Sequence, residues 1–292
     1  MSPADTPAVA LTIAGSDSGA GAGLQADLKA MAAAGVFGTT VVTAVTAQNT
    51  KAVTAVHPVP LEVIDAQLDA IFDDFAVGAT KTGLLGRVEV IELVARRAER
   101  GDFTNLVVDP VAVASSGALF LDERGLDAYR EKLLPQALLV TPNLWEASIL
   151  SGTPVEELDS PDAMVEVARA IRGFGSTWVL VKGGHLPGVD RHRPGVAPDD
   201  VRDVLVGPGV TELLDASWID TRNNHGTGCS LAASTAAHLA LGHDVPVAVR
   251  RAKQFVHRAL LGARDWSLGV GHGPLDPFGW GNGPDGSSVL DD

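Results

Sequence analysis

Residues 9–29 read VALTIAGSDSGAGAGLQADLK, a β-prone apolar stretch followed by a glycine-rich turn and then by a helix-like segment. Valine, threonine and isoleucine favour strands, and Leu24, Leu28 and Met31 share one face of a helix expected over residues 23–34. A strand, a tight turn and a helix in succession are typical of a βα unit. The quoted stretch therefore predicts an α/β fold if the same alternation continues along the chain.

The alternation does continue over most of the sequence. A second helix is expected over residues 61–75, where apolar residues recur at helical spacing. Strands are expected at about residues 8–14, 39–46, 77–81, 104–109, 137–141 and 177–182, with further strand-like segments at 201–206 and 210–216. Near-continuous apolar strands between helices predict a mostly parallel central sheet flanked by helices on both faces, a three-layer α/β/α architecture.

The chain is expected to form one domain over residues 1–265. With 292 residues, 46% hydrophobic and 20% charged, it is long enough to bury a sizeable core. Residues 185–200 are rich in Pro, Gly and charge and are interpreted as an exposed excursion. Residues 266–292 form a Gly/Pro-rich tail, which we expect to add little to the core and to be partly disordered.

Charge and composition exclude several classes of protein. The formal net charge of −14, from 22 basic and 36 acidic residues, argues against nucleic-acid binding. No stretch approaches the roughly 18 apolar residues of a membrane span, and residues 1–19 lack the basic start of a secretory signal. The single cysteine, Cys229, cannot form an internal disulfide. We therefore expect a cytoplasmic protein that binds neither nucleic acid nor membrane.

Ligands of open parallel sheets bind beyond the carboxyl ends of the strands. After the first expected strand, Gly15 begins a turn that lets the backbone approach a small ligand, and Asp27 projects from the following helix. The turn lacks the Gly-x-x-x-x-Gly-Lys-Ser/Thr pattern of a phosphate loop. No acidic residue lies between Leu28 and Leu61, which disfavours a dinucleotide site. A purely structural turn with a solvated Asp27 is the alternative.

Polar side chains also follow the later strands. Gln48 offers a donor and an acceptor on one amide, which suits the edge of a heterocycle, although such a residue also caps loops. Asp109, Asn143 and Glu146 could hold hydrated Mg²⁺ and nucleotide phosphates. Asn143 followed by Glu146 also fits a capping box, and the two interpretations are compatible. Lys182, before two glycines, either meets an anionic ligand or is solvated.

The strongest local signal is NNHGTGCS at residues 223–230. Gly226, Thr227 and Gly228 precede a helix-like segment of small residues, and a helix that begins there directs unpaired N–H groups at one point. Such an anion site provides the charge stabilisation that phosphoryl transfer needs. Cys229 lies in the field of this helix end, where the pKa of a thiol can fall below its ordinary value and the thiolate can accept a proton. The alternative is a small buried apolar residue.

Together these motifs resemble the hydroxymethylpyrimidine/phosphomethylpyrimidine kinases of thiamine biosynthesis, in the ribokinase-like superfamily. The matching segments span roughly residues 8–262 and read ALTIAGSDSGAGAGLQADLK, TAQNT, DPV, TPNLWEA, VLVKGGH and HGTGCSL. The resemblance implies ATP-dependent phosphorylation of 4-amino-5-hydroxymethyl-2-methylpyrimidine, and then of its monophosphate to the diphosphate. Relatives that phosphorylate sugars carry an Asp base where this chain has Cys229, so the cysteine indicates the branch that acts on pyrimidine and pyridoxal-like alcohols.

The resemblance also implies a role for each candidate on the acceptor side. Gln48 would hold the pyrimidine ring with Asp27 nearby, and the turn at Gly15 would close over the ligand. The stretch from Gly226 to Gly228 would form the anion hole. Cys229 would activate the hydroxymethyl group, whereas the second step has a phosphate acceptor and needs no strong base.

On the nucleotide side, the resemblance implies that Asp109, Asn143, Glu146 and Lys182 bind ATP and Mg²⁺. Asp109 and Glu146 would hold the metal through water. A homodimer is expected.

Three residues depart from the family pattern. Asn224 stands where Thr is common, Ala112 where Met is common and Ser230 where Thr is usual. These positions touch the pocket rim and leave the relative preference for the two steps open. Two alternative functions remain at this point, a pyridoxal or pyridoxine kinase of the same fold and a non-catalytic protein that keeps the pocket for sensing.

Overall fold

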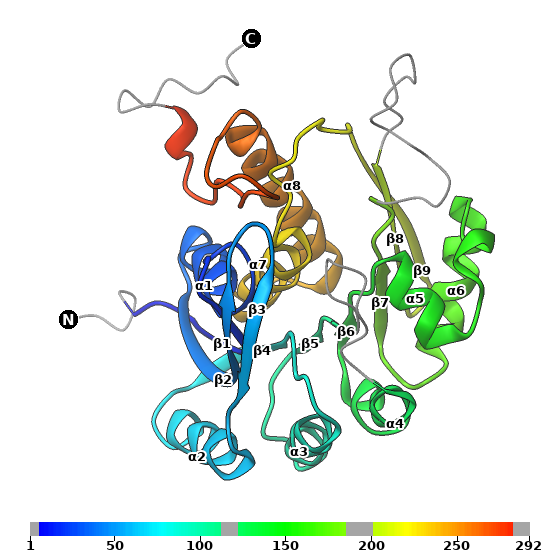
Figure 1. The fold of residues 1–292 in the computed structure, drawn as a ribbon. Helices are drawn as coiled ribbons and strands as arrows, with labels where there is room; N and C mark the ends of the chain where they lie inside the picture. The colour runs from blue at the N-terminus through cyan, green and yellow to red at the C-terminus, as the bar shows by residue number, and fades with distance from the viewer. Residues whose placement is uncertain (1–5, 112–121, 185–200, 283–292) are drawn as a thin grey trace.

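The computed structural model describes residues 6–111, 122–184 and 201–282. Within these ranges the strands form one nine-stranded sheet with the order β3-β2-β1-β4-β5-β6-β7-β8-β9 (Figure 1). The strands are β1 (Val9–Asp17), β2 (Phe37–Gln48), β3 (Val53–Pro58), β4 (Val77–Thr82), β5 (Leu106–Val108), β6 (Leu139–Val140), β7 (Trp178–Val181), β8 (Val201–Gly207) and β9 (Val210–Ala216).

Helices cover both faces of this sheet, which confirms the predicted three-layer architecture. In Figure 1, α2, α3 and α4 lie on one side of the strands and α1, α7 and α8 lie on the other. The helices are α1 (Gly23–Ala33), α2 (Leu61–Phe72), α3 (Val88–Glu99), α4 (Glu123–Ala128), α5 (Leu144–Ser151), α6 (Pro161–Arg172), α7 (Thr227–Ala240) and α8 (Val245–Ala263). None of them, within the described ranges, combines the length and apolar character that a membrane span requires.

The central strand β5 shows why the sequence encodes this layering. Leu106 and Val108 belong to the core cluster shared with α2 to α6, whereas Val107 belongs to the cluster shared with α7 and α8. Successive strand residues point to opposite faces, so a strand covered on both sides must be apolar throughout. Full burial of each such side chain contributes about 1.5–3 kcal/mol.

The sheet is parallel in its centre and antiparallel at both edges. Strands β2, β1, β4, β5, β6 and β7 pair in parallel, and β3, β8 and β9 pair antiparallel with their neighbours. Strand β3 was not predicted from the sequence. All of its residues are exposed, so it has no buried apolar face by which a strand is recognised.

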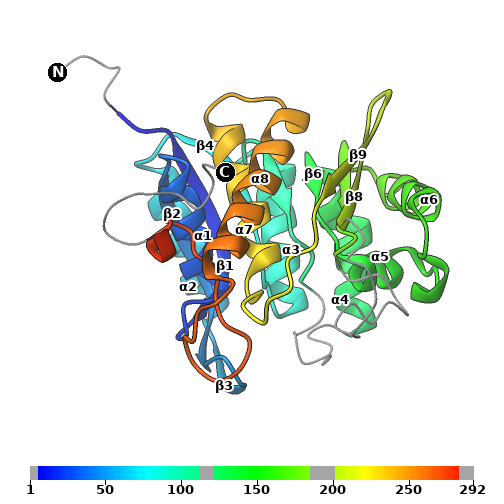
Figure 2. The same ribbon diagram turned by 90° about the horizontal axis from the view of Figure 1, so that it is seen from above.

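The segment after α8 contributes more to the packing than the sequence indicated. Leu275 and Asp276 are buried, and the Asp276 amide donates to the Ala259 carbonyl at 3.0 Å. Figure 2 shows the orange loop of this segment beside β3. Hydrogen bonding of the backbone fixes the segment, which an apolar pattern does not reveal. Residues 185–200 and 283–292 lie outside the described residues, and the domain division at residue 265 stays a prediction.

Candidate active site

A cavity of about 700 Å³ opens at the carboxyl ends of the parallel strands. Strand β1 lies between β2 and β4, so the direction in which successive strands are added to the sheet reverses at β1. Open α/β sheets bind ligands at such a switch point. The sequence-predicted residues that line this cavity are Gly15, Gln48, Asp109, Asn143, Glu146, Lys182, Gly226, Gly228 and Cys229. Gly15 lies within β1, at an irregularity in its pairing with β2 between Ala14 and Ser16.

The start of α7 forms the predicted anion site. Gly226 has a φ of +85°, a left-handed conformation that favours glycine, and a Cβ there would overlap the Gly21 carbonyl oxygen. Within the described part of the chain, the amides of Gly228 and Cys229 have no hydrogen-bond partner. These donors and the positive end of the helix dipole face the cavity, where they favour an anion.

Thr227 does not line the cavity. Its hydroxyl donates to the Asn224 carbonyl and so closes the turn that precedes α7. The anion site is therefore made of backbone amides, and the Thr227 side chain serves to hold their geometry.

Asp109 and Lys182 form an ion pair on one side of the cavity. Lys182 Nζ lies 3.0 Å from Asp109 Oδ1, and the Thr141 hydroxyl donates to the same oxygen at 3.2 Å. Burial would lower the pKa of Lys182, but the carboxylates of Asp109 and Glu146 outweigh this effect and raise it. The lysine therefore stays positively charged at the edge of the sheet, and the alternative of a solvated side chain is wrong.

Asn143 and Glu146 make the capping box that the sequence allowed. The Asn143 amide donates to Glu146 Oε2 at 2.8 Å, and the Glu146 amide donates to Asn143 Oδ1 at 2.9 Å. Both residues also line the cavity, so capping and ligand binding are compatible. Burial raises the pKa of Glu146 to about 7, with Lys182 opposing the increase and Asp109 adding to it.

The carboxylates of Asp109 and Glu146 suit a hydrated Mg²⁺ ion. In the described ranges no group of three or more His, Cys, Asp or Glu residues could hold a metal ion by itself. Mg²⁺ keeps several of its waters and commonly takes only one or two carboxylates, with substrate phosphates completing its shell. Two buried carboxylates at the mouth of an anion site meet that requirement.

The acceptor side of the cavity contains a chain of polar side chains. Gln48 Nε2 lies 3.1 Å from His225 Nε2, which lies 3.4 Å from Asp17 Oδ2. The amides of Gly21 and Ala22 donate to Asp17 Oδ2 at 3.1 and 2.9 Å. Burial would raise the pKa of Asp17, but the hydrogen bonds from His225 and from backbone amides outweigh it and lower the pKa. Gln48 is therefore oriented by a partner that itself is fixed by a carboxylate.

Asp27 lies behind the cavity wall, not on it. Both Asp27 and Lys81 are fully buried; Lys81 Nζ is 2.8 Å from Asp27 Oδ2, to which the Thr12 hydroxyl donates at 2.6 Å. The alternative of a solvated Asp27 is wrong, because a carboxylate on the inner face of α1 needs a buried cation. That carboxylate raises the pKa of Lys81 despite the opposing effect of burial. Breaking such a pair costs about 3–5 kcal/mol.

Cys229 is electrostatically coupled to this buried pair. Burial raises the pKa of its thiol to about 11, with the positive charge of Lys81 opposing the increase. Asp27 and Asp109 add to the increase. The expectation of a lowered thiol pKa is therefore wrong for the ligand-free protein. Loss of hydration outweighs the positive charge of Lys81, so the thiol is mostly protonated at neutral pH.

The phosphomethylpyrimidine kinase family model matches residues 17–276. This chain belongs to that family. The hydroxymethylpyrimidine/phosphomethylpyrimidine kinase of Rhizobium meliloti (strain 1021) is 45% identical over 271 residues, which cover 93% of this chain and 97% of the relative. The predicted family and the prediction of an ATP-dependent kinase are both confirmed.

Solved kinases share the fold. The ADP complex of Bacillus subtilis pyridoxal kinase superposes with a TM-score of 0.81 at 35% identity, covering 95% of this chain and 100% of that one. The phosphomethylpyrimidine kinase of Clostridium difficile 630 superposes with a TM-score of 0.73 at 34% identity, covering 86% and 99%. The ribokinase-like fold predicted from the sequence is thereby confirmed.

Several residues of the kinase site escaped the sequence analysis. Asp17 lies in the glycine-rich stretch after Gly15, and His225 directly precedes Gly226, but neither was predicted as a site residue. Lys81 could have been found, because a lysine inside a buried strand needs a partner. His272 also lines the cavity, and it lies in the segment interpreted as a tail.

The three departures from the family pattern have different positions. Asn224 lies beside His272, with its Oδ1 3.2 Å from His272 Nδ1. Ser230 is buried in the first turn of α7, where its amide donates to the Gly226 carbonyl. Ala112 lies outside the described residues.

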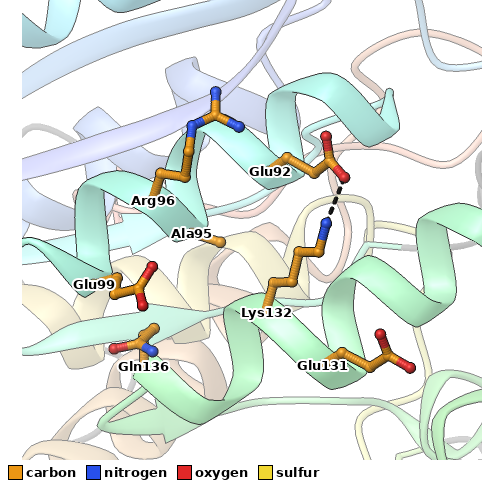
Figure 3. Close-up of a pocket in the computed structure, with 7 residues that line it drawn as sticks. All are labelled: Glu92, Ala95, Arg96, Glu99, Glu131, Lys132 and Gln136. Atoms are coloured by element: carbon orange, nitrogen blue, oxygen red, sulfur yellow. Dashed lines mark hydrogen bonds and ion pairs between the residues drawn. The ribbon is translucent and has the colours of Figure 1, made fainter.

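A second cavity, of about 350 Å³, shares no residue with the first (Figure 3). It lies between α3 and residues 131–136, and charged side chains surround it. Lys132 Nζ forms a 2.6 Å ion pair with Glu92 across it. An exposed pair of this kind contributes about 0–1 kcal/mol, and we assign no chemistry to this cavity.

We predict that Cys229 of the ligand-free kinase is alkylated slowly by iodoacetamide at neutral pH. Because its thiol pKa is raised to about 11, the rate should rise about tenfold per pH unit from pH 7 to 10 without a plateau. Whole-protein mass spectrometry reads this directly, since Cys229 is the only cysteine. The denatured chain is the control, and its rate should level off near the ordinary thiol pKa of about 8.5. A plateau below pH 9 in the folded kinase would contradict the prediction.

Proposed function

We propose that this kinase transfers the γ-phosphoryl group of ATP to the hydroxymethyl group of 4-amino-5-hydroxymethyl-2-methylpyrimidine, and then to the phosphate of the monophosphate formed. The observation that carries the proposal is the placement of Cys229 at the unpaired amides of α7, in one cavity with Gln48 and the Asp109–Glu146 carboxylates. The relatives named for this activity match nearly the whole chain.

In the first step the acceptor hydroxyl oxygen attacks the γ-phosphorus while the bond to the ADP oxygen breaks. The hydroxyl proton passes to Sγ of Cys229 in its thiolate form, which is the minor form at neutral pH because burial raises the pKa of the thiol to about 11. Gln48, oriented by His225, presents both a donor and an acceptor to the edge of the pyrimidine ring. The amides of Gly228 and Cys229 stabilise the negative charge on the transferred group, in an environment where such donors are strong.

The nucleotide lies on the side of Lys182, whose positive charge favours the phosphates. Asp109 and Glu146 would hold Mg²⁺ through water, and the ion would neutralise phosphate charge and orient the transferred group. In the second step the acceptor is a phosphate that is already ionised, so the same cavity works without a proton acceptor. A cytoplasmic homodimer remains our prediction for the assembly and location of the kinase.

We expect purified protein with MgATP to phosphorylate the hydroxymethylpyrimidine and its monophosphate, and to act far less efficiently on pyridoxal. Chromatography of the products for each acceptor, with kcat/KM for each, measures this preference. Pyridoxal is the essential comparison because solved pyridoxal kinases share the fold. A higher kcat/KM for pyridoxal would overturn the choice of substrate, and binding of both ligands without transfer would indicate a sensing protein.

We predict that Glu146→Gln raises the Mg²⁺ concentration needed for half-maximal activity about 10- to 100-fold, the usual effect of losing an outer metal partner. The amide oxygen of glutamine can still accept from Asn143, so the melting temperature without Mg²⁺ should not fall. Glu131→Gln, at an exposed glutamate of the second cavity, is the matched control. An unchanged Mg²⁺ requirement in Glu146→Gln would remove this residue from the metal site.

A further inference from the structure

The segment Gly269–Pro274, read GVGHGP, lies against two walls of the first cavity, and we call it the strap. A Cβ on Gly271 would overlap the Thr50 carbonyl oxygen, and a Cβ on Gly273 would overlap Asn223 Oδ1. Alternating glycines thus let the strap press its backbone on the turn after β2 and on the loop before α7.

Hydrogen bonds follow the same two walls. On the first wall, the Gly271 amide donates to Thr50 Oγ1 at 3.2 Å and the His272 amide donates to the Thr50 carbonyl at 3.0 Å. On the second wall, the His225 amide donates to the Gly273 carbonyl at 3.0 Å. The strap therefore ties the β2–β3 turn to the residue that orients Gln48 and that directly precedes the anion site.

One side chain of the strap reaches the cavity. His272 lines it together with Thr50 and His225, and His272 Nδ1 lies 3.2 Å from Asn224 Oδ1. The neighbouring Val270 is 66% exposed and does not line the cavity. The strap thus presents a polar, aromatic group to the acceptor half of the site.

A buried anchor holds the strap at its far end. The Asp276 carboxylate, itself buried, accepts from the amides of Trp280 at 2.9 Å and Gly281 at 2.8 Å. Leu275 is buried beside it. A carboxylate that satisfies several backbone amides fixes a loop that lacks regular structure, so His272 is held at the cavity in the ligand-free protein.

We propose that the strap is the specificity-determining wall of the acceptor pocket and that His272 contacts the heterocyclic alcohol. The contacts given above join the strap to Thr50 and His225, which line the cavity together with Gln48, and to Asn223 and Asn224 in the loop that leads to His225. None of these contacts involves the Asp109–Lys182 pair, which we leave to the nucleotide. The inference deepens the proposed function and rests on it for the identity of the acceptor.

The test compares His272→Ala with Val270→Ala from the same strap. We expect His272→Ala to raise KM for the acceptor about tenfold, the effect of losing one hydrogen bond in a site. KM for ATP should not change, because the strap makes none of its contacts with the Asp109–Lys182 pair. The melting temperature should not change either, because the His272 side chain faces the cavity and not the core. His272→Asn, which keeps a hydrogen-bonding group, should recover part of the affinity, and Val270→Ala should match the parent kinase.

Gly271→Ala tests the backbone contact separately. The added Cβ must displace the strap from Thr50, so acceptor KM should rise with ATP KM unchanged. If Gly271→Ala does not fold, His272→Ala and His272→Asn still test whether the strap contacts the acceptor. An unchanged acceptor KM in His272→Ala, or an equal rise of both KM values, would overturn the proposal.

The effects on the KM for the acceptor and the KM for ATP are compared with whichever acceptor the parent kinase phosphorylates. If it phosphorylates none, the Kd of the acceptor is measured by calorimetry instead. Pyridoxal as the only substrate would overturn the proposed function, while the ratio of acceptor to ATP effects would still decide the role of the strap. The two failures are therefore distinguishable.

Discussion

The contact between two glycine-rich turns is the constraint on which the rest of this kinase depends. Gly226 lies so close to the Gly21 carbonyl that no side chain fits between them. This contact fixes the first turn of α7 against the first turn of α1, and small residues such as Ala30 and Ala233 continue the packing of the two helices. Because of it, Cys229 and the free amides at the start of α7 face the cavity.

Buried charges complete the arrangement in pairs. Lys81 balances Asp27 behind Cys229, and Lys182 balances Asp109 at the nucleotide side. The chain as a whole carries a formal charge of −14, so its overall field repels ATP, and only local groups can attract phosphate. Lys182 and the start of α7 line the cavity and provide that local attraction, whereas Lys81 is buried behind the wall and paired with Asp27.

The sequence predicted what depends on local pattern. The apolar run at residues 106–108 indicated a strand buried on both faces, and the residues that follow the strands do meet at one cavity. Long-range partners were not predictable. Asp27 was expected at the ligand because nothing local shows that Lys81 lies opposite it. The pKa of Cys229 likewise depends on burial and on Lys81, Asp27 and Asp109, which are distant in the chain.

The strap was not predicted for the same reason, because its contacts are with residues distant in the chain. Its glycines are uninformative in isolation, because their spacing acquires meaning only against Thr50 and Asn223, which are distant in the chain. Strand β3 was missed for a related reason, since an exposed edge strand is stabilised by pairing and not by an apolar face. What local pattern leaves out is the set of contacts between turns, and in this kinase those contacts build the site.

The most direct test of the central claim is the effect of Cys229→Ala on the two phosphorylations measured side by side. If the thiol accepts the hydroxyl proton, the first transfer should slow by about 10² to 10⁴, the usual contribution of a positioned base. The second transfer, to a phosphate that is already ionised, should slow far less. Equal losses in both transfers would contradict the account, because they would mean that Cys229 supports the geometry of the anion site and moves no proton.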